Sequence, residues 1–233
     1  MPARLRRSPL MTVALGVALA SAVIVPLAER PARASFVDVG IEAGAQKRDL
    51  SGTSYKMGFA WQLHAELALI PPILMIGPYA TFAHATPDVP TKESPSNVAF
   101  RTFGLRAKLK LPIPGDFKPY GVAGLGWVHG EFPDQTLTIC DPQQPTLCAS
   151  RQFPNATANF VEFVLGGGLL WEIASPLAIT AEFNWRPTTG YKNDAYQKQL
   201  DGSQASGTAQ TNPPDPSRNG VSWTGMLGLA LVL

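Results

Sequence analysis

Residues 55 to 67 alternate between apolar side chains and other side chains. In YKMGFAWQLHAEL every second residue from Tyr55 to Leu67 is apolar, whereas Lys56, His64 and Glu66 are among the residues between. A β-strand places successive side chains on opposite faces, so the segment predicts a strand with one apolar and one polar face. A soluble sheet turns its apolar face to a protein core, whereas a membrane barrel turns it to lipid and keeps polar groups inside.

The same alternation recurs along the chain after residue 35. It is clear in five segments and noisier, with more glycine, in three others, which predicts eight strands. These segments are longer than the usual five or six residues of a globular strand, whereas a tilted membrane-spanning strand needs about 9–11. The clear segments are 37–46, 55–67, 103–111, 177–186 and 221–233, and the noisier ones are 73–84, 119–129 and 159–171.

The connections between these strands alternate in length. Short ones lie at about 70–72, 112–118 and 172–176, and longer polar ones at about 47–54, 86–97, 130–158 and 187–220. This alternation is typical of outer-membrane barrels, whose periplasmic turns are short and whose extracellular loops are long. The sequence therefore predicts an all-β fold, an eight-stranded antiparallel up-and-down transmembrane β-barrel. A soluble lipocalin-like barrel or a β-sandwich is the alternative.

The first 34 residues have the pattern of a cleaved signal peptide. Arg4, Arg6 and Arg7 precede the apolar run 11–27, and Ala32-Arg33-Ala34 offers a small-residue cleavage site before Ser35. A retained membrane anchor is the alternative. The chain has 19 basic and 17 acidic residues, and this leader holds five Arg and one Glu, so residues 35–233 carry a net charge of about −2. The sequence contains no basic patch that would indicate a nucleic-acid partner.

Taken together, these features resemble the small outer-membrane β-barrels of the OmpA, OmpX and OmpW type, over residues 35–233. The final segment, Gly228-Leu229-Ala230-Leu231-Val232-Leu233, is similar to the C-terminal assembly signal of that family. The resemblance implies a bacterial outer-membrane location with both termini periplasmic. It also implies contact with outer-membrane lipid, lipopolysaccharide and the insertion machinery, and we expect a monomer.

Charged side chains fall on the faces that would line such a barrel. Eight strands leave an interior only wide enough for side chains to fill, and an isolated buried charge costs several kcal/mol, so we expect the charges to pair. We expect Arg106 to lie between Glu42 and Glu182. The expected lumen charge network contains five acidic and five basic residues: Asp38, Glu42, Glu66, Glu162, Glu182, Lys56, Arg106, Lys108, Lys110 and Arg186.

The two cysteines, Cys140 and Cys148, lie in one polar connection, and in an exported protein they predict a local disulfide. Neither a metal motif nor a cofactor motif is present in the sequence. A nucleophilic site would need a hydroxyl, a histidine base and a carboxylate in reach. The three histidines, His64, His84 and His129, form no His-x-Ser pair, so we expect no enzymatic activity.

The sequence is compatible with three functions. The long polar loops favour a structural or cell-surface interaction role with an unknown extracellular ligand, the lumen being plugged by its charges. The inward glycines favour a narrow channel for ions or small solutes as the alternative. A lipid-modifying outer-membrane enzyme is the third.

Overall fold

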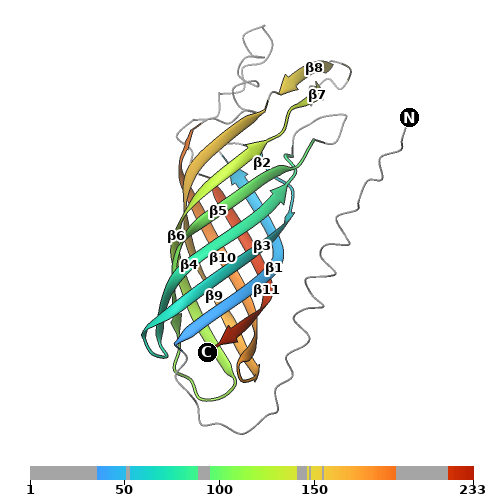
Figure 1. Ribbon diagram of the computed structural model, residues 1–233. Helices are drawn as coiled ribbons and strands as arrows, with labels where there is room; N and C mark the ends of the chain where they lie inside the picture. Colours follow the sequence, from blue (N-terminus) through green and yellow to red (C-terminus); the bar gives the residue numbers. More distant parts are fainter. Residues whose placement is uncertain are drawn as a thin grey trace, which may run out of the picture. The chain divides into compact units, whose positions relative to one another are not determined.

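The computed structural model describes residues 36–50, 53–88, 95–140, 146, 148–153, 155–192 and 220–233 (Figure 1). The predicted signal peptide, residues 1–34, lies outside the described residues, as does most of the predicted loop 187–220. Among the described residues, no helix is long and apolar enough to cross a membrane.

Eight long antiparallel strands of the described chain close into a barrel. Each strand pairs with the next in the series, and β1 pairs with β11 from Asp38↔Val232 to Asp49↔Val221, which closes the sheet. The predicted fold class is therefore confirmed. The barrel strands are β1 (Val37–Leu50), β3 (Gly58–Ile70), β4 (Leu74–Ala85), β5 (Val98–Lys110), β6 (Phe117–Phe132), β9 (Ala156–Ala174), β10 (Leu177–Lys192) and β11 (Val221–Val232).

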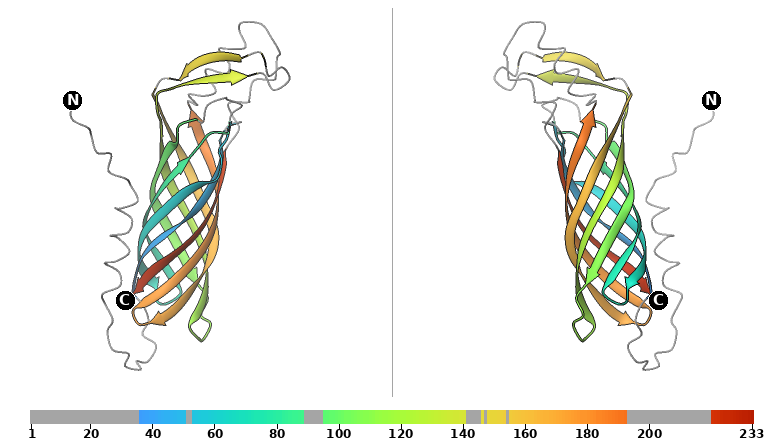
Figure 2. Two further views of the ribbon diagram at one scale, coloured as in Figure 1. Left: turned by 90° about the vertical axis from the view of Figure 1, so that its right-hand side faces the viewer. Right: turned by 90° about the vertical axis from the view of Figure 1, so that its left-hand side faces the viewer.

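Three shorter strands lie at the ends of the long ones. Strand β2 (Thr53–Ser54) pairs with the end of β1. Strands β7 (Gln135–Cys140) and β8 (Cys148–Phe153) form a separate two-stranded sheet, which follows on from the paired strands β6 and β9 (Figure 2). The described N-terminal residue, Phe36, and the C-terminal Leu233 are hydrogen-bonded at the opposite end of the barrel, which we call the lower end.

The outer face of the barrel is apolar along most of its height. Outward side chains near mid-height are well exposed, for example Leu105 at 60% and Leu227 at 67%. Outward aromatic pairs include Phe117 stacked on Trp171 toward the lower end and Trp185 beside Trp223 further up. The ten residue steps from Phe117 to Trp127 on β6 correspond to roughly 25 Å along the barrel axis at the usual strand rise and tilt. That height matches the apolar band of membrane barrels.

Several strands extend further than the sequence pattern predicted. Strand β1 runs to Leu50, β6 to Phe132 and β10 to Lys192, whereas the loops were expected to begin at 47, 130 and 187. The expected loop 130–158 also contains the β7–β8 hairpin. On β1 and β6 the reason is that the alternation continues with its polarity reversed: Leu50 and Phe132 point inward and are buried, whereas Glu131 points outward. A search for an outward apolar face ends where this reversal begins.

Candidate functional site: the barrel interior

The barrel interior buries nine of the ten side chains expected in the lumen charge network. They fall into two groups at different heights, together with one arginine that the sequence analysis did not select. The lower ionic group consists of Asp38, Glu66, Arg106, Lys108, Lys110 and Glu182, the upper ionic group consists of Arg48, Glu162 and Arg186, and Glu42 lies beside the lower group.

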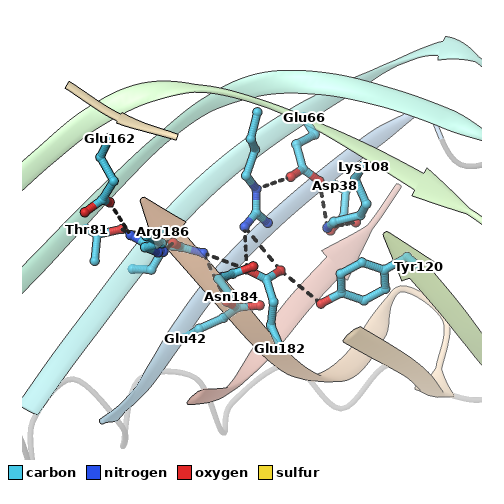
Figure 3. A network of polar contacts seen from close by, with 12 residues as sticks. Asp38, Glu42, Glu66, Thr81, Lys108, Tyr120, Glu162, Glu182, Asn184 and Arg186 are labelled. Carbon is cyan, nitrogen blue, oxygen red and sulfur yellow. Dashed lines mark hydrogen bonds and ion pairs between the residues drawn. The ribbon is translucent and has the colours of Figure 1, made fainter. Parts of the chain in front are cut away.

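Arg106 is the centre of the lower ionic group, because it pairs with both Glu66 and Glu182. Figure 3 labels Asp38, Glu66, Lys108 and Glu182 of this group. The Nε of Arg106 lies 2.5 Å from Glu66 Oε1, and its Nη1 lies 3.0 and 3.2 Å from the two carboxylate oxygens of Glu182. Glu182 also accepts hydrogen bonds from the Tyr120 hydroxyl at 3.1 Å and from Asn184 Nδ2 at 2.7 Å. The buried guanidinium thus holds carboxylates from two different strands, β3 and β10.

The two lysines of β5 complete the lower ionic group. Lys108 Nζ lies 3.0 Å from Asp38 Oδ2 and 2.7 Å from Glu66 Oε2, and Lys110 Nζ lies 3.3 Å from Asp38 Oδ2. The interactions join β1, β3 and β5 across the interior. Arginine and lysine from one strand therefore neutralise acids from three others.

In the upper ionic group, two arginines share one carboxylate. Arg48 Nη2 lies 2.9 Å from Glu162 Oε2, and Arg186 Nη1 lies 3.1 Å from Glu162 Oε1. The Arg48 guanidinium also lies over the ring of Phe100, 4.6 Å from its centroid, which is a cation–π geometry.

Gln62 connects the two ionic groups. Its Oε1 accepts hydrogen bonds from Arg186 Nη2 at 2.7 Å and from Thr81 Oγ1 at 3.0 Å. Its Nε2 donates to Glu42 Oε2 at 3.2 Å and to Glu182 Oε1 at 3.4 Å. The amide therefore presents its oxygen to a cation and its nitrogen to anions, which uses both ends of its hydrogen-bonding capacity.

Two details of the expected network are wrong. Arg106 lies between Glu66 and Glu182 rather than between Glu42 and Glu182, because Glu66 reaches its Nε while Glu42 is hydrogen-bonded to Gln62. Lys56 is exposed, whereas Tyr55 is fully buried. The alternation breaks at Lys56 and Met57, which are both exposed, because Tyr55 forms an isolated bridge with Pro87 and β3 begins only at Gly58.

The structure adds Arg48 and Gln62 to the site. Arg48 continues the inward series of even positions on β1, from Asp38 through Glu42 to Gln46, so its parity was visible in the sequence. It was assigned to a loop because Leu50 beyond it reverses the polarity of the face. The alternation also places Gln62 inward, near the mid-height charges, but Gln62 was left out of the expected charge network because it carries no charge.

A buried apolar cluster occupies the interior toward the upper end. Tyr55 and Phe132 each pack edge-on against Phe100, with ring centroids 5.6 and 6.3 Å apart. Side chains from seven barrel strands and from the segment before β3 therefore form an apolar layer. The buried members are Leu50, Tyr55, Ala60, Ala83, Ala85, Val98, Phe100, Val128, Phe132, Ala158, Phe160 and Met226.

The inward glycines make room for large neighbouring side chains. A Cβ on Gly126 would lie 2.3 Å from the Tyr79 hydroxyl oxygen, and one on Gly168 would lie 2.5 Å from that of Tyr120. A Cβ on Gly40 would lie 2.4 Å from the ring of His64. At these positions glycine permits close packing, and the space that it leaves is already filled by an aromatic ring or an imidazole.

Asp38, His64 and Glu66 have the right chemistry for a metal site. One ligand atom from each lies within 4.8 Å of the others, and all three side chains are buried. Both carboxylates, however, already pair with the Lys108 ammonium, at 3.0 and 2.7 Å. A divalent cation would have to displace that lysine, so the geometry favours the internal ion pairs.

The predicted disulfide lies in the β7–β8 hairpin. The backbone register places Cys140 directly opposite Cys148. The side chain of Cys140 lies outside the described part of the structure, so the bond itself stays a prediction.

Comparison with known proteins places the fold. No protein-family model and no curated protein matches the chain. The structure is similar to that of Neisserial surface protein A, with a TM-score of 0.56 and 12% sequence identity over 87% of this chain and 100% of that one. A weaker match is Ail, the attachment invasion locus protein of Yersinia pestis, with a TM-score of 0.42 and 14% identity over 86% of this chain and 100% of that one. At these identities the likeness concerns the fold alone.

Strand β5 offers a matched pair of arginines that tests the buried network. Replacing Arg106 by Met leaves Glu66 and Glu182 buried without this partner, and we expect the free energy of unfolding to fall by about 3–5 kcal/mol. Replacing Arg101, which is 47% exposed and pairs with Glu131 on the outer face, by Met should cost less than about 1 kcal/mol. Urea titration of the folded protein measures both values. Equal losses in the two variants would contradict a structural role for the network.

Proposed function

We propose that this protein spans the bacterial outer membrane as a closed barrel and acts through its outer end, in a structural or cell-surface interaction role. The filled interior carries this proposal. The two ionic groups, the Gln62 link and the apolar cluster around Phe100 occupy successive levels of the barrel. Because the inward Gly40, Gly126 and Gly168 are also covered by neighbouring side chains, the interior provides packing rather than a solute path.

The apolar outer band supports the membrane location. Exposed leucines at mid-height, such as Leu105 and Leu227, would be unfavourable in water, whereas lipid accommodates them. The outward aromatic pairs, one toward the lower end and one further up, fit the two interfaces. The fold that the chain shares with Neisserial surface protein A points the same way. We place both termini on the periplasmic side, because the long connections lie at the opposite end.

The partners follow from this location. The barrel wall would contact outer-membrane lipid and lipopolysaccharide, and the insertion machinery would recognise its last strand. The outer end, including the β7–β8 hairpin, is the surface left to contact an extracellular ligand. The protein would act as a monomer, and we propose no catalytic step.

The membrane claim is tested by the depth dependence of a charge on the outer face. Leu227 pairs with Ala43 and Ala181 near mid-height, so Leu227→Arg should lower the free energy of unfolding in phospholipid vesicles by about 2–4 kcal/mol. Thr157, an exposed residue near the start of β9, lies close to the upper end, and Thr157→Arg should cost at most about 1 kcal/mol. A soluble barrel would tolerate both changes alike.

The plugged interior is tested by electrical recording. The folded protein, inserted into a planar lipid bilayer, should give no discrete conductance steps, since the two ionic groups, Gln62 and the apolar cluster all lie within the lumen. A shift in gel mobility on heating confirms that the sample is folded. Regular steps in the natural protein would overturn the plug and establish the narrow channel instead.

The mass of the protein after alkylation tests the hairpin disulfide. The opposed positions of Cys140 and Cys148 in the register support the bond, which closes a short loop and should stabilise the hairpin by about 2–3 kcal/mol. Protein from the cell envelope, alkylated after unfolding without a reductant, should gain no mass, and prior reduction should add two alkyl groups. Labelling of both cysteines without reduction would contradict the bond.

A further inference from the structure

The outer wall carries a row of polar side chains directly above its apolar band, on strands β5, β6 and β9. In the register, Phe103 pairs with Trp127, and the next outward pair above them is Arg101 and His129. His129 pairs in turn with Asn159. His129 is two residues beyond Trp127, which is roughly 5 Å further along the barrel axis at the usual strand rise and tilt. The polar row therefore begins at the height where a membrane changes from hydrocarbon to headgroups.

Short contacts hold these side chains in one layer. Arg101 Nη1 lies 2.9 Å from Glu131 Oε1, and Arg101 Nη2 lies 3.0 Å from Glu131 Oε2. Glu131 Oε1 also lies 3.6 Å from His129 Nε2, and His129 Nδ1 lies 2.8 Å from Asn159 Oδ1. The ring of Trp127 lies 6.2 Å from that of His129. We call these five residues, Arg101, Trp127, His129, Glu131 and Asn159, the wall patch.

The wall patch is open on its outer side. The side chains of Arg101 and Glu131 are 47% and 40% exposed, and Trp127 is 53% exposed. Ion pairs with this degree of exposure contribute little to folding, so their polar groups are available to a ligand at small cost. The patch is therefore an ordered surface whose side chains the barrel does not need for its own stability.

The chemistry of the wall patch fits a sugar. Arg101 and Glu131 balance each other in charge, and Glu131 would repel a bare phosphate. A sugar hydroxyl is both a donor and an acceptor, so it matches a guanidinium and a carboxylate that lie side by side. The C–H face of a sugar ring is apolar and packs against an exposed aromatic ring such as that of Trp127.

Strands β10 and β11 differ at the corresponding place. Above the outward pair Trp185 and Trp223, the next outward pair is Pro187 and Val221, whose side chains have no polar atom. A row of polar side chains is therefore not a general consequence of leaving the apolar band. Its restriction to β5, β6 and β9 indicates a local site.

We propose that the wall patch binds the sugar headgroup of a lipopolysaccharide molecule in the outer leaflet. The height of the patch selects this ligand over a glycan of another cell. The patch lies at the membrane surface, below the β7–β8 hairpin into which β6 and β9 continue, where lipid headgroups are always in contact with the wall. This inference rests on the proposed membrane location and names one lipid that the barrel wall recognises.

Native mass spectrometry of the folded protein in detergent micelles is the first test. Lipopolysaccharide is offered against an equal concentration of phosphatidylglycerol, which is anionic but has no sugar ring. The natural protein should retain lipopolysaccharide in preference, and dephosphorylated lipopolysaccharide should still bind. Equal retention of the two lipids would overturn the proposal. Loss of binding on dephosphorylation would also overturn it, because the phosphate would then be the recognised group.

Variants assign the binding to the wall patch. Arg101→Met should weaken lipopolysaccharide binding about tenfold, as expected for the loss of one charge-assisted hydrogen bond. Asn159→Leu removes a neutral member of the patch and should weaken binding as well. Lys47 points outward on β1 and pairs with Trp223, so Lys47→Met removes the same charge beside another aromatic ring and should leave binding unchanged. Equal weakening in Arg101→Met and Lys47→Met would show a general attraction of cations for anionic lipid and would overturn the site.

Insertion into vesicles made of phospholipid alone tests the proposed function separately. A barrel that folds and inserts there but shows no preference for lipopolysaccharide would overturn this inference and leave the proposed function standing. A barrel that does not insert would overturn both.

Discussion

The small circumference of an eight-stranded barrel is the constraint on which the rest of this structure depends. Such a barrel encloses only enough space for its own inward side chains, so every charge placed there is removed from water. Desolvation of a charge is costly unless a partner of opposite sign lies in hydrogen-bonding distance. The short separations around Arg106 and Glu162, between 2.5 and 3.2 Å, are the consequence of that requirement.

The same constraint explains why Gln62 matters as much as a charged residue. The upper ionic group has one cation too many, and Glu42 beside the lower group is an additional anion. A neutral amide between them accepts from Arg186 and donates to Glu42, so each excess charge is stabilised without a direct ion pair. A glutamate at this position would repel Glu42 and Glu182, and a lysine would repel Arg186. Only a side chain with a donor and an acceptor at its tip fits both neighbours.

Strand positions could be predicted from the sequence wherever the outward face of a strand is apolar and its inward face is polar. Leu105 and Leu109 on β5 show this pattern plainly, because they alternate with the buried Arg106, Lys108 and Lys110. The prediction failed where the polarity reverses, as at Leu50 and Phe132, because the apolar side chain there belongs to the interior. It failed again at Lys56, where a break in the strand shifts the parity of the chain. Alternation records which residues share a face, but it does not say which face is inside.

The identity of the charged residues could be predicted better than their pairing. The alternation along each strand correctly identified Arg106, Glu66 and Glu182 as inward residues, since the direction of a side chain depends only on its position along the backbone. The partners depend on side-chain length and on strand stagger around the barrel, which one sequence does not contain. Arg106 reaches Glu66 on β3 because β4, which lies between their strands, presents Gly77 in register with Arg106. The absence of a side chain at Gly77 leaves the path across β4 open.

Toward the upper end the inward side chains become apolar, and this change affects the ionic groups below. The apolar layer around Phe100 lies against Arg48, and the ring faces its guanidinium at 4.6 Å. An aromatic face attracts the cation while excluding water, so the layer both seals the interior and fixes the side chain of Arg48. The ion pairs below are then held in a medium of low polarity, where each is stronger than it would be in water. The apolar layer and the ion pairs therefore depend on each other.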